Sequence, residues 1–244
     1  MPALILIPGL VTDAEIWRDQ LAALPPHWRT LVTDVHTRHA RIEAMAQALL
    51  QEHSGQLLLC GASMGGMVAM EAARQAPERI LGLALLGTSA RPETEAHRRQ
   101  RGNAIQMFKD GRVAEFVRAS GTMAFSREQA GNKVLAARYK ELVLRADTTQ
   151  WIRQNQALME RPDARLHMRQ VRCPTLVLCG ADDLMTPPEL SREIATLVPA
   201  AELHLLPRCG HMLTLEQPAT VNRLLLDWLN RLVITPAPLT PLGM

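Results

Sequence analysis

The residue in this sequence that is best suited to carry out chemistry is a serine between two glycines. Ser63 is the central residue of the G-x-S-x-G stretch Gly61–Gly65, which follows the apolar run Leu57–Cys60 and precedes a segment rich in alanine and methionine. A serine at such a junction of strand and helix is typical of a nucleophile elbow, where small neighbours avoid collisions in a tight turn. The N–H groups and positive dipole end of the following helix would then face the reacting centre. The pattern predicts that Ser63 is a nucleophile.

A serine hydroxyl attacks well only when a base accepts its proton, which makes the histidines the next candidates. His211 lies in the loop between the last predicted strand and the last predicted helix. Because the carboxyl ends of parallel strands meet at one edge of a sheet, an imidazole in that loop can reach the serine. We therefore predict that His211 is the base. The seven other histidines are expected on the surface or at a rim: His27, His36, His39, His53, His97, His167 and His204.

The base in turn needs a carboxylate that fixes its tautomer and stabilises the imidazolium. Asp182 and Asp183 directly follow the predicted strand 175–179, so one of them points toward the same edge of the sheet. The other can cap the helix that begins near Pro187, or pair with an arginine. A serine, a histidine and an aspartate in these positions predict nucleophilic acyl chemistry.

These side chains require a sheet whose strands end on the same side. Short β-rich runs alternate with helical patterns, which favours an α/β fold with a parallel sheet covered on both faces. From residue 91 to about residue 169 the pattern is helical and rich in arginine, without a convincing strand. We expect strands at 4–8, 28–35, 56–60, 80–87, 175–179 and 202–206, and helices at 13–24, 41–52, 65–75, from about 187, and at 217–232.

In its elements and in the chain order Ser63, Asp183, His211, the sequence resembles the α/β-hydrolase family, in its small bacterial carboxylesterase and lactonase branch. The likeness covers nearly the whole chain, residues 4–233. It implies the α/β-hydrolase fold, a mostly parallel sheet flanked by helices with an inserted helical cap. The expected domains are a core of residues 1–90 and 170–234, a cap of residues 91–169 and a flexible C-terminal tail of residues 235–244.

The resemblance also implies roles for single residues. The family's G-x-x-D motif places the acid at Asp183, with Asp182 as the second candidate. The backbone N–H groups of Leu10 and Met64 would form the oxyanion hole. The sequence departs from the family at residues 8–9, where Pro-Gly replaces the usual His-Gly.

A second departure from the family follows the second predicted strand. Relatives run from an aspartate into a glycine-rich stretch, whereas residues 34–39 read as a short basic loop. We therefore expect the entrance to the site to be shaped differently from that of the relatives.

The implied activity is hydrolysis of a carboxylic ester, lactone or thioester of a small or medium acyl substrate through an acyl-serine intermediate. Ser63 argues against haloalkane dehalogenases and epoxide hydrolases, which would carry an aspartate there. No phosphate-binding loop or metal-ligand cluster is visible in the sequence, so no cofactor is expected. The alternatives are a cofactor-free perhydrolase or haloperoxidase, a C–C bond hydrolase, and a non-catalytic ligand-binding member of the fold.

The composition of the 244 residues is that of a globular protein, with 47% apolar and 21% charged residues. No apolar run is long enough to span a bilayer, and the N-terminus lacks the basic region of a signal peptide, so we expect a cytoplasmic protein. The four scattered cysteines are then expected as free thiols. The net charge of +3 predicts neither a nucleic-acid nor a membrane partner.

The charge is unevenly distributed along the chain. Residues 91–172 carry 17 Lys+Arg against 9 Asp+Glu, and the densest cluster is Arg98, Arg99 and Arg101. This cluster either steers an acidic acyl group, or an acidic acyl carrier, toward Ser63, or is a solvated helix face. A small-molecule ester is the expected partner in either case. Five apolar residues of the segment either line an acyl pocket or pack its helices together: Met107, Phe108, Phe116, Met123 and Phe125.

Overall fold

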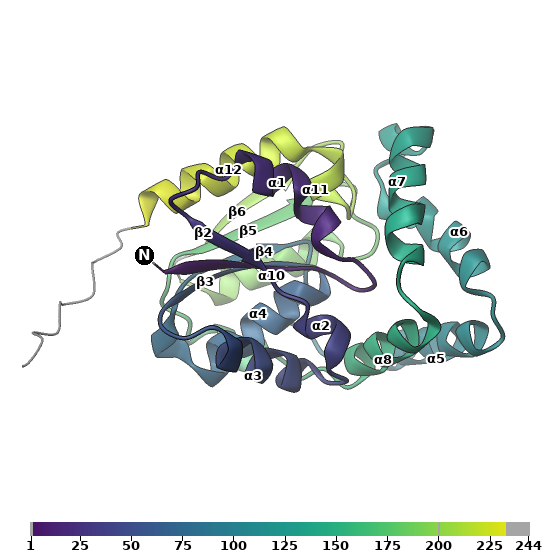
Figure 1. Cartoon of the computed structure of the whole chain (residues 1–244), viewed down its shortest axis with the longest axis horizontal. Helices are drawn as coiled ribbons and strands as arrows, with labels where there is room; N and C mark the ends of the chain where they lie inside the picture. Colours follow the sequence, from purple (N-terminus) through teal and green to yellow (C-terminus); the bar gives the residue numbers. More distant parts are fainter. Residues whose placement is uncertain (1, 200, 233–244) are drawn as a thin grey trace, which may run out of the picture.

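The computed structural model describes residues 2–199 and 201–232. Its centre is a six-stranded sheet with the strand order β2-β1-β3-β4-β5-β6 (Figure 1). Every neighbouring pair is parallel, which confirms the predicted parallel sheet. The predicted C-terminal tail, residues 235–244, lies outside the described residues. The strands are β1 Ala3–Ile7, β2 Arg29–Val32, β3 Leu57–Ala62, β4 Ile80–Leu86, β5 Thr175–Gly180 and β6 Ala201–Leu206.

Two layers of helices cover the sheet and explain why its central strands are apolar throughout. Successive residues of a strand point to opposite faces, so a strand covered on both faces needs no polar positions. One face packs against α12, α1 and η1, and the other against α3, α4 and α10. These elements are η1 Ala14–Trp17, α1 Arg18–Ala23, α3 Ile42–Glu52, α4 Met64–Gln75, α10 Pro188–Leu197 and α12 Pro218–Arg231, with the short η2 Pro77–Arg79 and α11 Leu213–Glu216 between them.

Two predicted elements differ from the structure. The single helix expected at 13–24 is a 3₁₀ turn, η1, followed by α1, because the backbone leaves helical geometry at the buried Trp17. The strand expected at 28–35 ends at Val32, where the Thr33 hydroxyl accepts the N–H of Val35 at 3.3 Å and turns the chain. The expected basic loop 34–39 therefore contains a helix, α2 Val35–Arg38, whose first two residues are buried.

The segment between β4 and β5 is helical where the structure describes it. Figure 1 shows α6 and α7 standing away from the sheet, beyond the carboxyl ends of the strands, while α5 and α8 pack against each other. No described helix is long and apolar enough to cross a membrane. The helices of this segment are α5 Glu95–Lys109, α6 Val113–Ala124, η3 Arg127–Gln129, α7 Lys133–Leu144, α8 Thr148–Met159 and α9 Arg165–Met168.

Candidate active site

Ser63 occupies a strained turn between β3 and α4. Its backbone has φ 52° and ψ −116°, a conformation that an L-residue adopts only when the surroundings impose it. The N–H of Ser63 donates to the Leu86 carbonyl at 2.8 Å, and the Thr88 hydroxyl donates to the Ser63 carbonyl at 2.7 Å. Strand β4 and the residues just after it therefore hold the turn in place.

The two glycines that flank Ser63 are required by close backbone contacts. A Cβ on Gly61 would collide with the backbone of Gly65 at the start of α4. A Cβ on Gly65 would collide with the carbonyl of Ile7 at the end of β1. The G-x-S-x-G spacing thus allows α4 to start directly above the sheet, with Ser63 at its N-terminal end.

The structure brings together the three side chains that the sequence singled out. The Ser63 hydroxyl lies 3.1 Å from Nε2 of His211, and Nδ1 of His211 lies 2.8 Å from Oδ2 of Asp183. Asp183 follows β5 and His211 follows β6, so both reach Ser63 from the carboxyl edge of the sheet. Asp182 is exposed, and its side chain takes no part in this chain of contacts.

The Asp183 carboxylate is held by four hydrogen bonds. Oδ1 accepts the N–H groups of Met185 and Thr186, at 2.8 and 2.9 Å. Oδ2 accepts the Thr186 hydroxyl at 2.8 Å in addition to His211. Thr186 was not predicted from the sequence. An aspartate side chain that accepts N–H groups two and three residues later is nevertheless a common local pattern. The carboxylate therefore has a single orientation toward the imidazole.

Burial and charge act in opposite directions on this pair. Burial would raise the pKa of Asp183, but the positive charge of His211 and the hydrogen bonds from His211 and Thr186 hold that pKa below its usual value. Burial would lower the pKa of His211, but the Asp183 carboxylate raises it above the ordinary histidine value. The pair is therefore built to stabilise an imidazolium next to Ser63.

The two predicted oxyanion donors, Leu10 and Met64, belong to backbone segments close to Ser63. Met64 is the first residue of α4, where a backbone N–H has no acceptor within the helix. Leu10 follows Gly9, whose α-carbon approaches so closely that a Cβ there would lie 3.2 Å from the Ser63 Cβ. The donation of these two N–H groups to an oxygen that gains negative charge stays a prediction.

A cavity of about 480 Å³ opens at Ser63 and His211. Of the five apolar residues considered for its wall, Phe116 and Met123 line it, while Met107, Phe108 and Phe125 do not. Phe108 instead packs against Trp151 where α5 meets α8, with the two rings tilted and their centroids 4.9 Å apart. Of the three clustered arginines, Arg101 lines the cavity, whereas Arg98 and Arg99 are exposed on α5.

A partly buried carboxylate, that of Glu216, links the loop of His211 to the end of α6. Glu216, on α11, accepts the N–H of Gly210 at 2.8 Å and the N–H of Ser126, after α6, at 3.0 Å. The N–H of Met212 also donates to the Ala124 carbonyl, at 3.1 Å. The position of His211 is therefore coupled to the end of α6.

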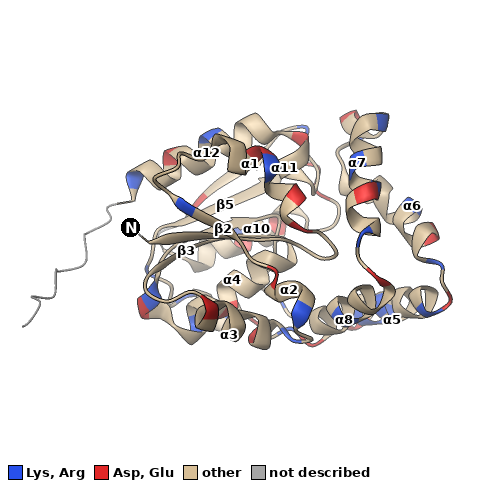
Figure 2. Cartoon of the chain, viewed as in Figure 1, with Lys and Arg blue, Asp and Glu red and all other residues tan. Residues whose placement is uncertain are grey.

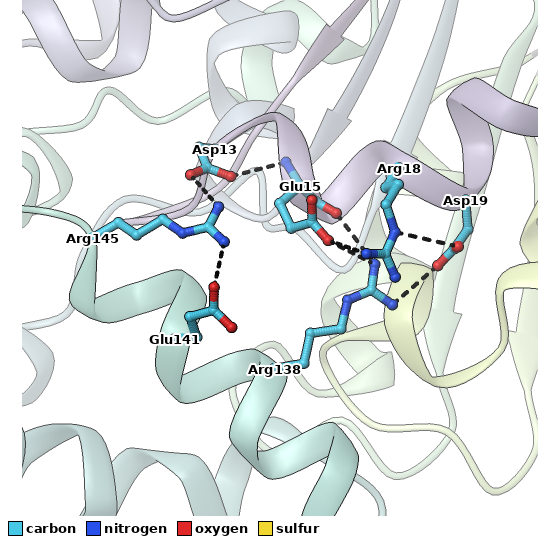
Figure 3. A network of polar contacts seen from close by, with 7 residues as sticks. All are labelled: Asp13, Glu15, Arg18, Asp19, Arg138, Glu141 and Arg145. Atoms are coloured by element: carbon cyan, nitrogen blue, oxygen red, sulfur yellow. Dashed lines mark hydrogen bonds and ion pairs between the residues drawn. The ribbon is translucent and has the colours of Figure 1, made fainter.

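Arginines of the helical segment form ion pairs with acidic residues near the start of the chain. Figure 2 shows charged residues of both signs on α1 and α7. Arg138 of α7 donates to Asp19 at 3.1 Å and to Glu15 at 3.4 Å (Figure 3). Arg145, just after α7, pairs with Asp13 at 3.2 Å. Part of the positive charge of the helical segment is therefore used in contacts with the sheet domain.

Comparison with known proteins identifies the family of this chain. A family model described as the alpha/beta hydrolase fold matches residues 38–218, well over half of the chain. The chain belongs to the alpha/beta hydrolase fold family. This confirms the resemblance that the motifs indicated.

The relatives of this alpha/beta hydrolase are named for different activities. The chain is 28% identical to a pimeloyl-[acyl-carrier protein] methyl ester esterase of Aromatoleum aromaticum, over 89% of this chain and 94% of the relative. It is 26% identical to a 2-hydroxy-6-oxo-6-(2'-aminophenyl)hexa-2,4-dienoic acid hydrolase of Metapseudomonas resinovorans, over 93% and 83%. A thermophilic esterase from Thermogutta terrifontis has a similar structure, with a TM-score of 0.87, 25% identity and 95% and 90% coverage. These likenesses support a hydrolase.

In this alpha/beta hydrolase, hydrogen bonds that the sequence did not predict hold the loop that contains Leu10, called the Leu10 loop below. The N–H of Val11 donates to Oε1 of Gln154, a fully buried residue of α8, at 2.7 Å. Nε2 of Gln154 donates to the His36 carbonyl, and Nε2 of His36 donates to the Thr12 carbonyl, both at 2.8 Å. The loop has Pro-Gly at residues 8–9, and the histidine that contacts it, His36, belongs to α2.

The expected surface position of His36 is therefore wrong. Its side chain is 1% exposed, since α2 packs it beneath the Leu10 loop. Burial lowers the pKa of His36, so the ring is held neutral while its Nε2–H donates to Thr12. No sequence signal distinguishes it, because its partners come from distant parts of the chain.

Among the described residues, no three or more His, Cys, Asp or Glu are placed to hold a metal ion.

Proposed function

We propose that the protein is a serine hydrolase that cleaves a carboxylic ester, lactone or thioester through an acyl-serine intermediate. The observation that carries this proposal is the chain of contacts from Ser63 through His211 to Asp183, at 3.1 and 2.8 Å, at a cavity of about 480 Å³. Membership of the alpha/beta hydrolase fold family and the esterases among the similar proteins support it.

In the first half of the proposed reaction, the Ser63 oxygen attacks the acyl carbon while Nε2 of His211 accepts the hydroxyl proton. The carbonyl π electrons move to the oxygen, and the N–H groups of Leu10 and Met64 donate to that oxyanion. Each such donor is worth about 3–4 kcal/mol of barrier in enzymes of this kind. When the tetrahedral intermediate collapses, the bond to the leaving alcohol or thiol breaks, and His211 returns the proton to it.

In the second half, water repeats the attack on the acyl-serine. His211 accepts a proton from the water, the oxyanion forms again in the same place, and the Ser63 oxygen leaves with the proton from His211. Asp183 stays ionised throughout and stabilises the imidazolium. The products are the carboxylic acid and the free enzyme.

We propose further that residues 91–169 form the cap of this site. Phe116 and Met123 of α6, together with α5 and α8, would then bound the acyl pocket. An acidic acyl carrier as the donor of the acyl group is consistent with the relatives that act on carrier-protein esters. The exposed Arg98 and Arg99 of α5 would receive such a carrier.

The test is covalent labelling followed by a substrate screen. A fluorophosphonate probe is expected to label the wild-type protein on Ser63 and to leave Ser63→Ala unlabelled, as read by intact-mass and peptide mass spectrometry. Model esters of increasing acyl length are expected to be hydrolysed by the wild type, with a loss of several orders of magnitude in Ser63→Ala. Labelling of another residue, or more than a tenth of the activity left in the variant, would contradict the proposal.

A further inference from the structure

One end of the cavity carries two arginines and a single carboxylate. Arg101 of α5, Arg161 after α8 and Glu93 before α5 all line it, and no other lining residue among those described carries a permanent charge. Arg101 donates to Glu93 at 3.2 Å, and Arg161 forms a buried ion pair with the same oxygen. Glu93 therefore compensates one of the two positive charges, and the cavity keeps a surplus of one.

Both guanidinium groups are fixed in place and still have a donor to offer. Nε of Arg161 donates to the Arg91 carbonyl at 2.8 Å, and Nη1 of Arg101 donates to Oδ1 of Asn155 at 2.9 Å. Within residues 2–199 and 201–232, Nη2 of each arginine has no hydrogen-bond acceptor. Neither atom is among the buried donors that lack a partner, so both keep some accessible surface on side chains that line the cavity. Two forked donors on rigid side chains suit a carboxylate.

A backbone hydrogen bond links two segments of the chain near these arginines. The two connections between the sheet and residues 91–169 meet there, since the N–H of Ala164 donates to the Ala90 carbonyl at 2.9 Å. Burial lowers the pKa of the Arg161 guanidinium, and Glu93 opposes that shift. The uncompensated charge therefore sits in a partly desolvated place, where an anion is bound more strongly than at an exposed arginine.

Most of the other surface that lines the cavity is apolar and includes Leu10, Ile16, Phe116 and Met123. The cavity thus combines an acyl-attacking serine, an apolar wall and a fixed cationic end. We infer that Arg101 and Arg161 form a carboxylate-binding subsite, and that the substrate is an ester of an acyl chain that carries a second, ionised carboxyl group. This inference rests on the proposed function, because it names the substrate class of the same site.

The first experiment compares two esters of equal acyl length, monomethyl adipate and methyl hexanoate, by the methanol that they release. We expect kcat/KM to favour the anionic ester by about ten- to hundredfold, as hydrogen bonds to a charged group do. Arg101→Gln is expected to abolish that preference, because it lowers kcat/KM for monomethyl adipate far more than for methyl hexanoate. The matched control is Arg99→Gln, which removes the same charge from the exposed side of α5 and is expected to keep the preference.

The second experiment is independent of catalysis. Calorimetry on Ser63→Ala is expected to show that a dicarboxylate of the series from succinate to suberate binds at least tenfold more tightly than the monocarboxylate of equal length. Addition of Arg101→Gln is expected to remove the difference, and thermal unfolding checks that this variant is folded. If Arg101→Gln does not fold, the comparison of dicarboxylates with monocarboxylates on Ser63→Ala alone decides.

The outcomes separate the two proposals. Equal kcat/KM for the two esters together with equal binding of dicarboxylates and monocarboxylates would overturn the subsite and leave the serine hydrolase standing. Selective dicarboxylate binding without probe labelling of Ser63 would support the subsite and overturn the proposed function. Inorganic phosphate serves as a control anion, and binding of phosphate as tight as that of the best dicarboxylate would overturn the assignment to a carboxylate.

Discussion

At the scale of single residues, the neighbouring aspartates have different environments. Asp183 is buried and bonded to His211, whereas Asp182 is exposed. We predict that Asp183→Asn lowers kcat by about 10³–10⁴-fold, because an asparagine cannot hold the imidazole in its working tautomer or stabilise its charge. Asp182→Asn is the matched control, with an expected change of less than twofold. Steady-state rates on the best ester from the screen test this prediction. A larger loss in Asp182→Asn than in Asp183→Asn would assign the role of the acid to Asp182.

The same pair sets a pH dependence. The protonated imidazole cannot accept the Ser63 proton, so activity is lost as the pH falls through the pKa of His211. Because Asp183 raises that pKa above the ordinary histidine value, the loss is expected to begin at a higher pH than for a free histidine. In Asp183→Asn the residual activity is expected to persist to lower pH, since the stabilising charge is gone. Profiles of kcat/KM against pH test this, and an unchanged acid limb in the variant would contradict it.

At the scale of elements, α8 reaches the proposed oxyanion hole. Gln154 accepts the N–H of Val11, whose φ of 48° is held in the left-handed region, and Val11 follows Leu10 directly. We predict that Gln154→Ala lowers kcat by about tenfold or more with little change in KM, because a displaced donor weakens transition-state binding rather than substrate binding. The control is Gln156→Ala, on the exposed side of the same helix.

The prediction for Gln154 needs a measurement that loss of packing alone would not change. A boronic acid that forms a tetrahedral adduct with a serine is expected to bind Gln154→Ala more weakly by the same factor as kcat falls. If its affinity is unchanged while thermal stability drops, Gln154 has a structural role only.

At the scale of the whole molecule, the charge difference between residues 91–172 and the remainder is in part an internal attraction. Arg138 of α7 bridges to Asp19 and Glu15, while Arg112 pairs within its own segment with Glu115 (Figure 3 shows the former). Partly exposed pairs contribute about 0.2–1 kcal/mol each and weaken in salt. We therefore predict that Arg138→Gln speeds hydrogen exchange of α7 by about two- to fivefold at low salt, with a smaller effect at high salt.

Arg112→Gln provides the comparison for Arg138→Gln, because it removes an equal charge without breaking a contact to η1 or α1. Its exchange in α7 is expected to match that of the wild type. Equal exchange in the two variants would show that the pairs in Figure 3 do not hold α7 to the sheet domain.

The elements and the elbow could be predicted from the sequence because their causes are local. A buried parallel strand is a short apolar run. Gly61 is required by a backbone contact with Gly65, within one strand-turn-helix unit. The histidine and aspartate were predicted from their places after strands, since parallel strands must end at a common edge. The partners Gln154 and Val11 lie 143 positions apart in the chain, and the pairing of Arg101 and Arg161 with Glu93 also joins distant segments. Such contacts leave no periodic trace in the sequence, because they are set by the packing of α5 and α8 against the sheet domain. For the same reason His36 was misjudged: its burial depends on which loop α2 meets.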